Sequence, residues 1–408
     1  MSNERKKLFK KFEKEHYTIL VPDMCPIHFD LLTHCLEKDG MHMVIVTPQG
    51  PAAKEEGLAS IHNDACYPAL ITCGAFVDAL KTGQYDLNKT AVIMSQTGGG
   101  CRASNYISLF RKAFEKEFPT VPVLSLNFSG LEKERSLPLT LRRSLEFLHC
   151  VVYGDFLMNL VNQSRPYYGE EKVNETLNCC LEYLHRQIGH QAFYQRKKNY
   201  RYLLSQFKPL EPPGKRKPRV GIVGEIFVKY SPYANNHLKD FLISQNTEVV
   251  EPSLSEFVLY CIYNLINDHT LYGMNHLLNG LYKKAYKIAL KETRIAAKAL
   301  EGTRFEPFED FAEIVENAPE VISTGVKMGE GWLIPAEMVS FAKGDKVKNI
   351  VVVQPFGCLP NHIVGKGMIR PVKERYPEEN IVPLDFDASS TQVNQENRLK
   401  LMLANLKD

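Results

Sequence analysis

Hydrophobic and polar positions along this chain alternate between two kinds of pattern. Short apolar runs rich in β-branched residues, typical of buried parallel strands, stand at 17–22, 43–48, 90–96 and 121–127. Apolar residues with helical spacing lie between them, at 27–38, 66–82 and 102–118. Strands that alternate with helices predict an α/β fold built on a doubly wound parallel sheet. We expect this first domain to span 16–130, after a charged leader helix at 1–15.

The pattern changes after residue 130 and later returns. Between 131 and 208 the apolar period is helical, as in "LPLTLRRSLEFLHCVVYGDFLMNL". A linker rich in proline and charge follows at 209–218. Strand signals then reappear at 219–227, 247–253, 348–356 and 380–387. This arrangement predicts a second α/β domain at 219–408, with a helical insertion at 255–300.

Composition and charge narrow the function classes. The 408 residues are 44% hydrophobic and 24% charged, which are ordinary values for a globular protein. A net charge of +3 is too small to indicate a nucleic-acid-binding protein. No apolar run reaches the ~18 residues of a membrane span, and no signal peptide opens the chain. The expectation is a cytoplasmic protein.

The ten cysteines are the main candidates for chemistry. No CxxC pair occurs, which argues against a zinc ribbon and against a thioredoxin-like site. Half of them lie in helical patterns and are interpreted as small packing residues. These are Cys35, Cys150, Cys179, Cys180 and Cys261. The other five are Cys25, Cys66, Cys73, Cys101 and Cys358.

Two of these five stand at matching places in the two halves. "AVIMSQTGGGC" and "NIVVVQPFGC" each end a strand with glycine and then a cysteine that opens a helix, at Cys101 and Cys358. Ligands of open α/β sheets bind at this strand edge, and a helix N-terminus lowers the pKa of a thiol. We therefore expect Gly98–Gly100 and Gly357 to leave room for a bulky anionic group between Cys101 and Cys358.

Three further cysteines are weighed against this pair. Cys66 heads a helix in "NDACYPAL", a third position of the same kind, and Cys25 follows the first strand. Cys73 lies two helical turns after Cys66 and is interpreted as facing the sheet. Widely spaced thiolates suit an iron–sulfur cluster, with zinc as the alternative metal and a nucleophilic cysteine as a weaker reading. The glycine-rich turn lacks the Lys-Ser/Thr ending of a phosphate-binding loop.

Four stretches carry a family resemblance: "NDACYPAL", "SQTGGGCRASNY", "VGIVGEIFVKYSPYANNHL" and "QPFGCLPNHIVGKGMI". The chain resembles, from about residue 16 to 403, iron–sulfur proteins of the 2-hydroxyacyl-CoA dehydratase and benzoyl-CoA reductase superfamily, in a branch linked to ATPase activators. The resemblance implies two Rossmann-like domains with a cluster at their interface. It also implies a [4Fe–4S] cluster held by Cys66, Cys101 and Cys358, with one iron open. The related double-cubane proteins hold an [8Fe–9S] cluster, for which Cys25 and Cys73 are candidate extra ligands.

The implied function is that of a reductase or dehydratase component in anaerobic metabolism. An ATP-hydrolysing activator of the ASKHA type, with its own iron–sulfur cluster, would deliver low-potential electrons for reduction of an acyl-CoA or a small molecule. The chain would act in a homodimer or heterodimer, and segment 131–208 is a candidate docking face. Candidate catalytic residues are Glu225, His362 and Arg102, and Trp332 is expected in a loop near the cleft. The alternative is a non-catalytic electron-transfer or scaffold protein.

Overall fold

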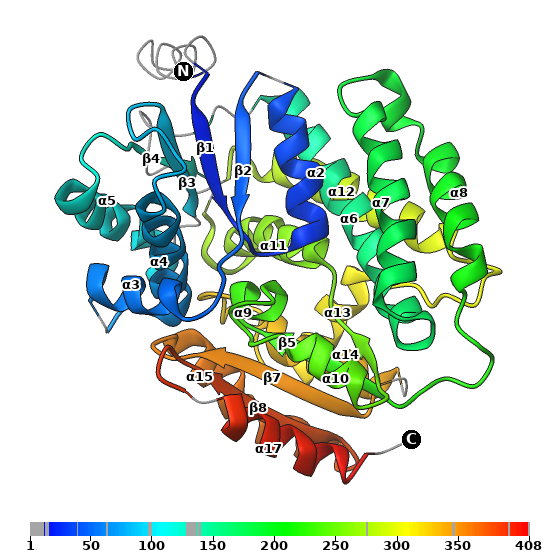
Figure 1. Ribbon diagram of the computed structural model, residues 1–408. Coiled ribbons are helices and arrows are strands. Elements are labelled where there is room, and N and C mark those ends of the chain that lie inside the picture. The colour runs from blue at the N-terminus through cyan, green and yellow to red at the C-terminus, as the bar shows by residue number, and fades with distance from the viewer. Residues whose placement is uncertain are drawn as a thin grey trace.

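The computed structural model describes residues 16–38, 40–62, 64–96, 100–127, 140–274, 276–344, 347–390 and 392–406, with Phe12 and Leu137. Within these residues the chain is a mixed α/β protein with two four-stranded parallel sheets (Figure 1). Of the expected features, Gly98, Gly99, most of the leader helix 1–15 and residues 131–136 lie outside the described residues.

The first sheet has the strand order β2-β1-β3-β4. Its strands are β1 (Thr18–Pro22), β2 (His42–Val46), β3 (Thr90–Gln96) and β4 (Val123–Asn127). Its helices are α2 (Pro26–Glu37), α3 (Ala52–Ser60), α4 (Tyr67–Lys81), η1 (Arg102–Asn105) and α5 (Tyr106–Glu117). Successive residues of a strand face opposite sides, so Leu20 packs with α4 and α5 while Ile19 and Val21 pack with α2. Both faces of the sheet are therefore covered.

The second sheet repeats this order as β6-β5-β7-β8. Its strands are β5 (Arg219–Gly224), β6 (Glu248–Val250), β7 (Asn349–Pro355) and β8 (Asn380–Phe386). The helices around it are α9 (Ile226–Tyr230), α10 (Leu238–Ser244), α13 (Phe311–Asn317), η4 (Ala318–Glu320), α14 (Leu333–Lys343), α15 (Leu359–Val364), η5 (Lys366–Met368), α16 (Ile369–Arg375) and α17 (Gln392–Leu403). β7 is buried at every position. All the predicted strands are thus confirmed, and both sheets are parallel as expected.

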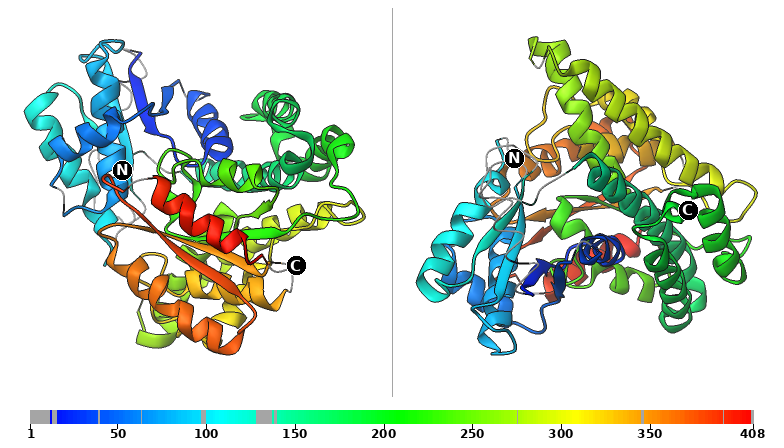
Figure 2. Two further views of the ribbon diagram at one scale, coloured as in Figure 1. Left: turned by 60° about the horizontal axis from the view of Figure 1, so that its bottom comes forward. Right: turned by 90° about the horizontal axis from the view of Figure 1, so that it is seen from above.

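Helices between the two halves form a third layer beside the sheets (Figure 1, Figure 2). They are α6 (Leu141–Tyr168), α7 (Glu170–Gln187), η2 (Gln191–Tyr194), α8 (Arg196–Phe207) and η3 (Lys208–Leu210). α6 is long and apolar enough to cross a membrane, but 72% of its apolar window is buried inside the protein. It packs against α2, α7, α11 and α12, as the core helix of this layer.

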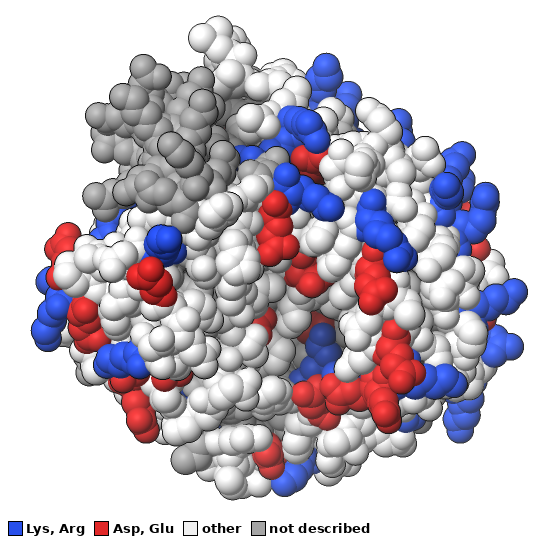
Figure 3. Space-filling view, turned by 45° about the horizontal axis from the view of Figure 1, so that its top comes forward, with Lys and Arg blue, Asp and Glu red and all other residues white. Residues whose placement is uncertain are grey.

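The predicted insertion at 255–300 consists of two helices, α11 (Leu254–Tyr272) and α12 (Asn279–Ala299). Ser253 and Glu256 form a capping box that starts α11. Gly273, with φ of 67°, ends it in the left-handed conformation that favours glycine. On the face drawn in Figure 3, acidic and basic side chains are interleaved around a central hollow, as the small net charge leads one to expect.

Three sequence interpretations are wrong. Cys179 and Cys261 are exposed rather than packed in the core. Because adjacent helical residues point about 100° apart, only Cys180 of the Cys179–Cys180 pair faces the interior of α7. Trp332 is fully buried at the start of α14, where its Nε1 donates a hydrogen bond to Asn264 Oδ1 over 3.0 Å, and it does not lie in a cleft loop.

Candidate metal centre

Three of the candidate cysteines occupy the same local position in three different elements. Cys66 is the N-cap residue of α4, Cys101 that of η1 and Cys358 that of α15. None of the three side chains forms a regular capping hydrogen bond, although the backbone amides of Ala69, Ala103 and Asn361 lower the pKa of the three thiols. Each thiol is therefore left for another partner, at the end of the helix that attracts negative charge.

The two halves of the molecule meet at these cysteines. Tyr67 N donates a hydrogen bond to Phe356 O over 3.0 Å, which joins the start of α4 to the turn after β7. Gly357 has φ of 75°, and a Cβ there would lie 3.1 Å from both Ala65 O and Cys66 Cα. A side chain there would be strained by the positive φ and would push the two backbones apart by a few tenths of an ångström. The structure thus brings Cys66 of the first half beside the segment that carries Cys358.

Cys101 lies near the same point. The charge of a Cys66 thiolate would raise the pKa of Cys101. A Cβ at the preceding Gly100 would overlap the Met328 side chain. Protein atoms fill the space beside both glycines, from Met328 at Gly100 and from Ala65 and Cys66 at Gly357, so these two glycines allow protein segments to pack closely and the open space predicted beside them is not seen. The expected effect of helix N-termini on thiol acidity is outweighed, since burial raises the pKa of Cys66 to about 11 and of Cys101 to about 12. Burial also raises the pKa of Cys358.

Two buried carboxyl groups face the cysteines. Glu225 caps α9, because its Oε2 accepts a hydrogen bond from Val228 N over 2.8 Å, and Glu330 Oε1 accepts one from Ile226 N over 3.0 Å. Burial and then the charge of Glu330 raise the pKa of Glu225 to about 8, and burial raises the pKa of Glu330. The charges of both carboxyls raise the pKa of the Cys101 and Cys358 thiols further. A bound cation would reverse this and favour the thiolates.

Two polar side chains that the sequence reasoning missed touch the cysteines. Tyr106 Oη lies 2.6 Å from Cys66 Sγ. Asn361 Nδ2 donates to Glu330 Oε2 over 2.8 Å and to Cys358 Sγ over 3.4 Å. Both residues follow a candidate cysteine within one or two helical turns, in "CRASNY" and "CLPN". That spacing is the signal that would have found them.

Cys261 is a further thiol close to this group. Its side chain is exposed to solvent, although many protein atoms lie around it. These surroundings, and then the charge of Glu330, raise the pKa of Cys261 to about 12. Glu330 therefore acts on Cys101, Cys358 and Cys261 alike.

Of the other predicted site residues, some lie beside the three cysteines and some lie away from them. Arg102 is exposed, donates to Asp64 O, and lowers the pKa of Cys66 through its charge. His362 instead places its Nδ1 3.1 Å from Gln354 Oε1 of β7. Cys73 is fully buried in the core that α4 forms with the first sheet.

Cys25 belongs to a separate buried chain of polar groups. Its Sγ lies 2.9 Å from His28 Nδ1, and His28 Nε2 lies 2.8 Å from Asp155 Oδ1. Asp155 in turn accepts hydrogen bonds from Leu254 N and Ser255 N at the start of α11. A Cβ at Gly154 would overlap the His28 ring, so glycine makes room for it.

The residues at the converging helix ends fit a thiolate-bound group. Among the described residues, no three His, Cys, Asp or Glu side chains are arranged to hold a single metal ion. An iron–sulfur cluster makes a different demand, because each thiolate binds its own iron and the thiols stand farther apart. Cys66, Cys101 and Cys358 are soft donors of the kind that such a cluster needs.

The chain was compared with protein-family models and with curated proteins. No family model matches the chain, and no curated protein matches it. The assignment of a function therefore rests on the sequence stretches and the site geometry described above.

Proposed function

We propose that this chain is a cytoplasmic iron–sulfur protein of the 2-hydroxyacyl-CoA dehydratase and benzoyl-CoA reductase type. It would consist of two Rossmann-like, doubly wound domains. The repeated strand order and the helices on both faces of each sheet support that description of the fold. Cys66, Cys101 and Cys358 would hold the cluster. A bound cluster would supply one-electron reduction of a substrate.

One observation carries the proposal. Cys66 and the turn that carries Cys358 come from the two halves of the chain to a point where their backbones touch, and Cys101 opens the segment whose Tyr106 contacts Cys66. The buried Glu225 and Glu330, with pKa values raised, would serve as proton donors to a reduced substrate.

The surface beside the cysteines favours a partner protein. Large apolar side chains are exposed there, namely Met328 at 50%, Phe356 at 53% and Leu359 at 66%. Met328 contacts the Gly100 turn, and Phe356 and Leu359 flank Cys358. These positions, rather than segment 131–208, would form the docking face for an ATP-hydrolysing activator that delivers electrons.

The test is the iron content of anaerobically purified variants. Cys66→Ala, Cys101→Ala and Cys358→Ala should each lose most of the iron and the associated visible absorbance. Cys179→Ala is the matched control, because that thiol is exposed on α7 and should not affect iron. If any of the three variants keeps its full iron content, that cysteine is not a ligand, and a colourless wild-type protein refutes the cluster.

A second candidate function is non-catalytic electron transfer, and Cys261 is the observation that favours it. Its accessible thiol near Glu330 would close the open iron as a fourth ligand. Cys261→Ala distinguishes the two functions. In the electron-transfer case the variant loses iron or changes its electron paramagnetic resonance spectrum. In the catalytic case its spectrum is unchanged, and the wild-type spectrum responds to acetylene or an acyl-CoA.

A further inference from the structure

The end of the α11–α12 hairpin carries large apolar side chains that the rest of the protein does not cover. The turn between the two helices lies at the outer edge of the molecule in both views of Figure 2. Leu277, just before α12 begins, is 96% exposed, and five neighbours are each at least 47% exposed. An exposed apolar group of this size marks an interaction surface. These side chains, which form the hairpin tip, are Leu271, Tyr272, Met274, Leu277, Leu278 and Leu281.

The chain around the hairpin tip is positively charged. From residue 269 to residue 291 it contains four lysines and no aspartate or glutamate. The whole protein has a net charge of only +3, so this segment is a local excess of positive charge. A partner for the tip should therefore combine an apolar region with negative charge. The four lysines, all with exposed side chains, are Lys283, Lys284, Lys287 and Lys291.

The apolar and basic groups follow one another along the hairpin. The apolar side chains come from the last turn of α11, the connecting turn and the start of α12. Lys283 and Lys287 lie two and six residues after Leu281, which places Lys287 about 9 Å behind Leu281 along the helix axis. The half-buried Tyr282 stands between the two groups. An apolar end followed by tyrosine and lysine matches the order of acyl chains and headgroups at a bilayer surface.

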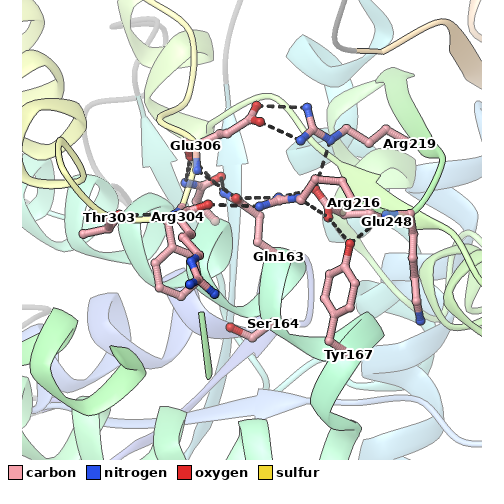
Figure 4. A network of polar contacts seen from close by, with 12 residues as sticks. Gln163, Ser164, Tyr167, Arg216, Arg219, Glu248, Thr303, Arg304 and Glu306 are labelled. Carbon is pink, nitrogen blue, oxygen red and sulfur yellow. Dashed lines mark hydrogen bonds and ion pairs between the residues drawn. The ribbon is translucent and has the colours of Figure 1, made fainter. Parts of the chain in front are cut away.

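The base of the hairpin is fixed within the protein. Asp155 of α6 accepts hydrogen bonds from the first two residues of α11. Beyond the end of α12, Arg216 donates to Arg304 O over 3.0 Å. Figure 4 shows this part of the chain, where Arg219 also forms two hydrogen bonds with Glu306. A hairpin held at its base presents the tip in one orientation, so that binding at the tip orders few groups.

We propose that the hairpin tip binds the surface of a membrane that contains anionic lipids. The apolar side chains enter the boundary between headgroups and acyl chains, about 5–10 Å deep, and the lysines contact the headgroup phosphates. An acidic protein surface would meet one face of the hairpin, whereas these apolar side chains come from both helices and the turn. Symmetric pairing of two tips would bring the lysines of both copies together, which is unfavourable. The inference is independent of the proposed reductive function, since it uses neither the cysteines nor an electron donor.

The test is co-sedimentation of the full-length protein with lipid vesicles. Vesicles of phosphatidylglycerol and phosphatidylcholine in equal parts should bind wild type at least about 10-fold more tightly than phosphatidylcholine alone, and added salt should weaken the binding. Leu277→Ser with Leu281→Ser should weaken binding to the mixed vesicles about 10–100-fold. Lys283→Gln with Lys284→Gln should weaken it about 10–30-fold. Leu401→Ser is the matched control, because Leu401 is 69% exposed on α17 and its replacement should leave binding unchanged.

Fluorescence quenching measures whether the tip enters the bilayer. The fluorescence of Leu277→Trp should be quenched by lipids brominated in their acyl chains, whereas that of Leu401→Trp should not. Equal binding to both kinds of vesicle, or wild-type binding by Leu277→Ser with Leu281→Ser, overturns the proposal. Absence of binding to any vesicle also overturns it and assigns the tip to a protein. In that case a dimer that becomes monomeric in the same double variant identifies a second copy of this chain.

Discussion

Replacing Gly357 by alanine probes the closest approach between the two halves of the chain. The new Cβ would lie 3.1 Å from Ala65 O and 3.1 Å from Cys66 Cα, and 3.4 Å from Cys66 N. All of these are backbone atoms, which do not move aside as the end of a flexible side chain does. The turn that carries Cys358 must therefore shift away from Cys66.

The cost has two parts. Gly357 has φ of 75°, a conformation that costs an alanine about 1–2 kcal/mol. The steric overlap adds about 1–3 kcal/mol, the usual cost of overpacking. Gly83 provides the control, because it has φ of 73° and nothing within 4 Å of the position of a Cβ. Gly83→Ala should therefore carry the first cost alone.

Urea denaturation of the two variants, with iron analysis of each, tests this reasoning. We expect Gly357→Ala to lose more stability than Gly83→Ala by about 1–3 kcal/mol and to lose most of its iron. Gly83→Ala should keep wild-type iron. Equal losses of stability in the two variants, with full iron in Gly357→Ala, would show that the approach of the two backbones does not matter to the site.

Two further predictions concern the buried groups outside the site. Burial alone would lower the pKa of His28, but Cys25 and Asp155 raise it to about 10, so its contribution is complete below about pH 6.5 and lost as the pH rises through 10. His28→Gln should therefore be destabilised by about 3–5 kcal/mol at about pH 6 and by less near pH 10, and a difference independent of pH in urea denaturation contradicts this. Cys180→Ala should cost about 0.5–3 kcal/mol, and Cys179→Ala less than about 0.5 kcal/mol. Thermal unfolding of the two variants decides between them, and equal costs would place both thiols in the core.

The strands were the most predictable part of the fold. Parallel strands buried on both faces form continuous apolar runs, as "NIVVVQP" does, and each run predicted in the sequence corresponds to a strand. Helix details were harder. The expected helix at 102–118 begins as the η1 turn, because Asn105 has φ of −108° and ψ of −1° before α5 starts.

The positions of the candidate cysteines could be predicted from the strand ends in the sequence. The residues that surround them could not. Glu330 lies in a loop far from any strand signal, and only the fold brings it beside Ile226 and Asn361. Cys261 was interpreted as a core residue because it lies in the helical pattern "FVLYCIYNLI". In α11 its neighbours Leu259 and Tyr260 are buried, and Cys261 itself is exposed. The acidity of the thiols was also misjudged, because helix position is visible in a sequence and burial is not.

The meeting of distant chain segments at Cys66 and Cys358 has a consequence for biosynthesis. A ribosome adds about 5–20 residues per second, so Cys358 emerges on the order of 10–50 s after Cys101, roughly 250 residues earlier. During that interval Cys66 and Cys101 are present in the chain, but Cys358 has not yet been synthesised. Any group held by all three must be loaded after translation is nearly complete, and a chain stopped before β7 would keep two reactive thiols exposed to oxygen.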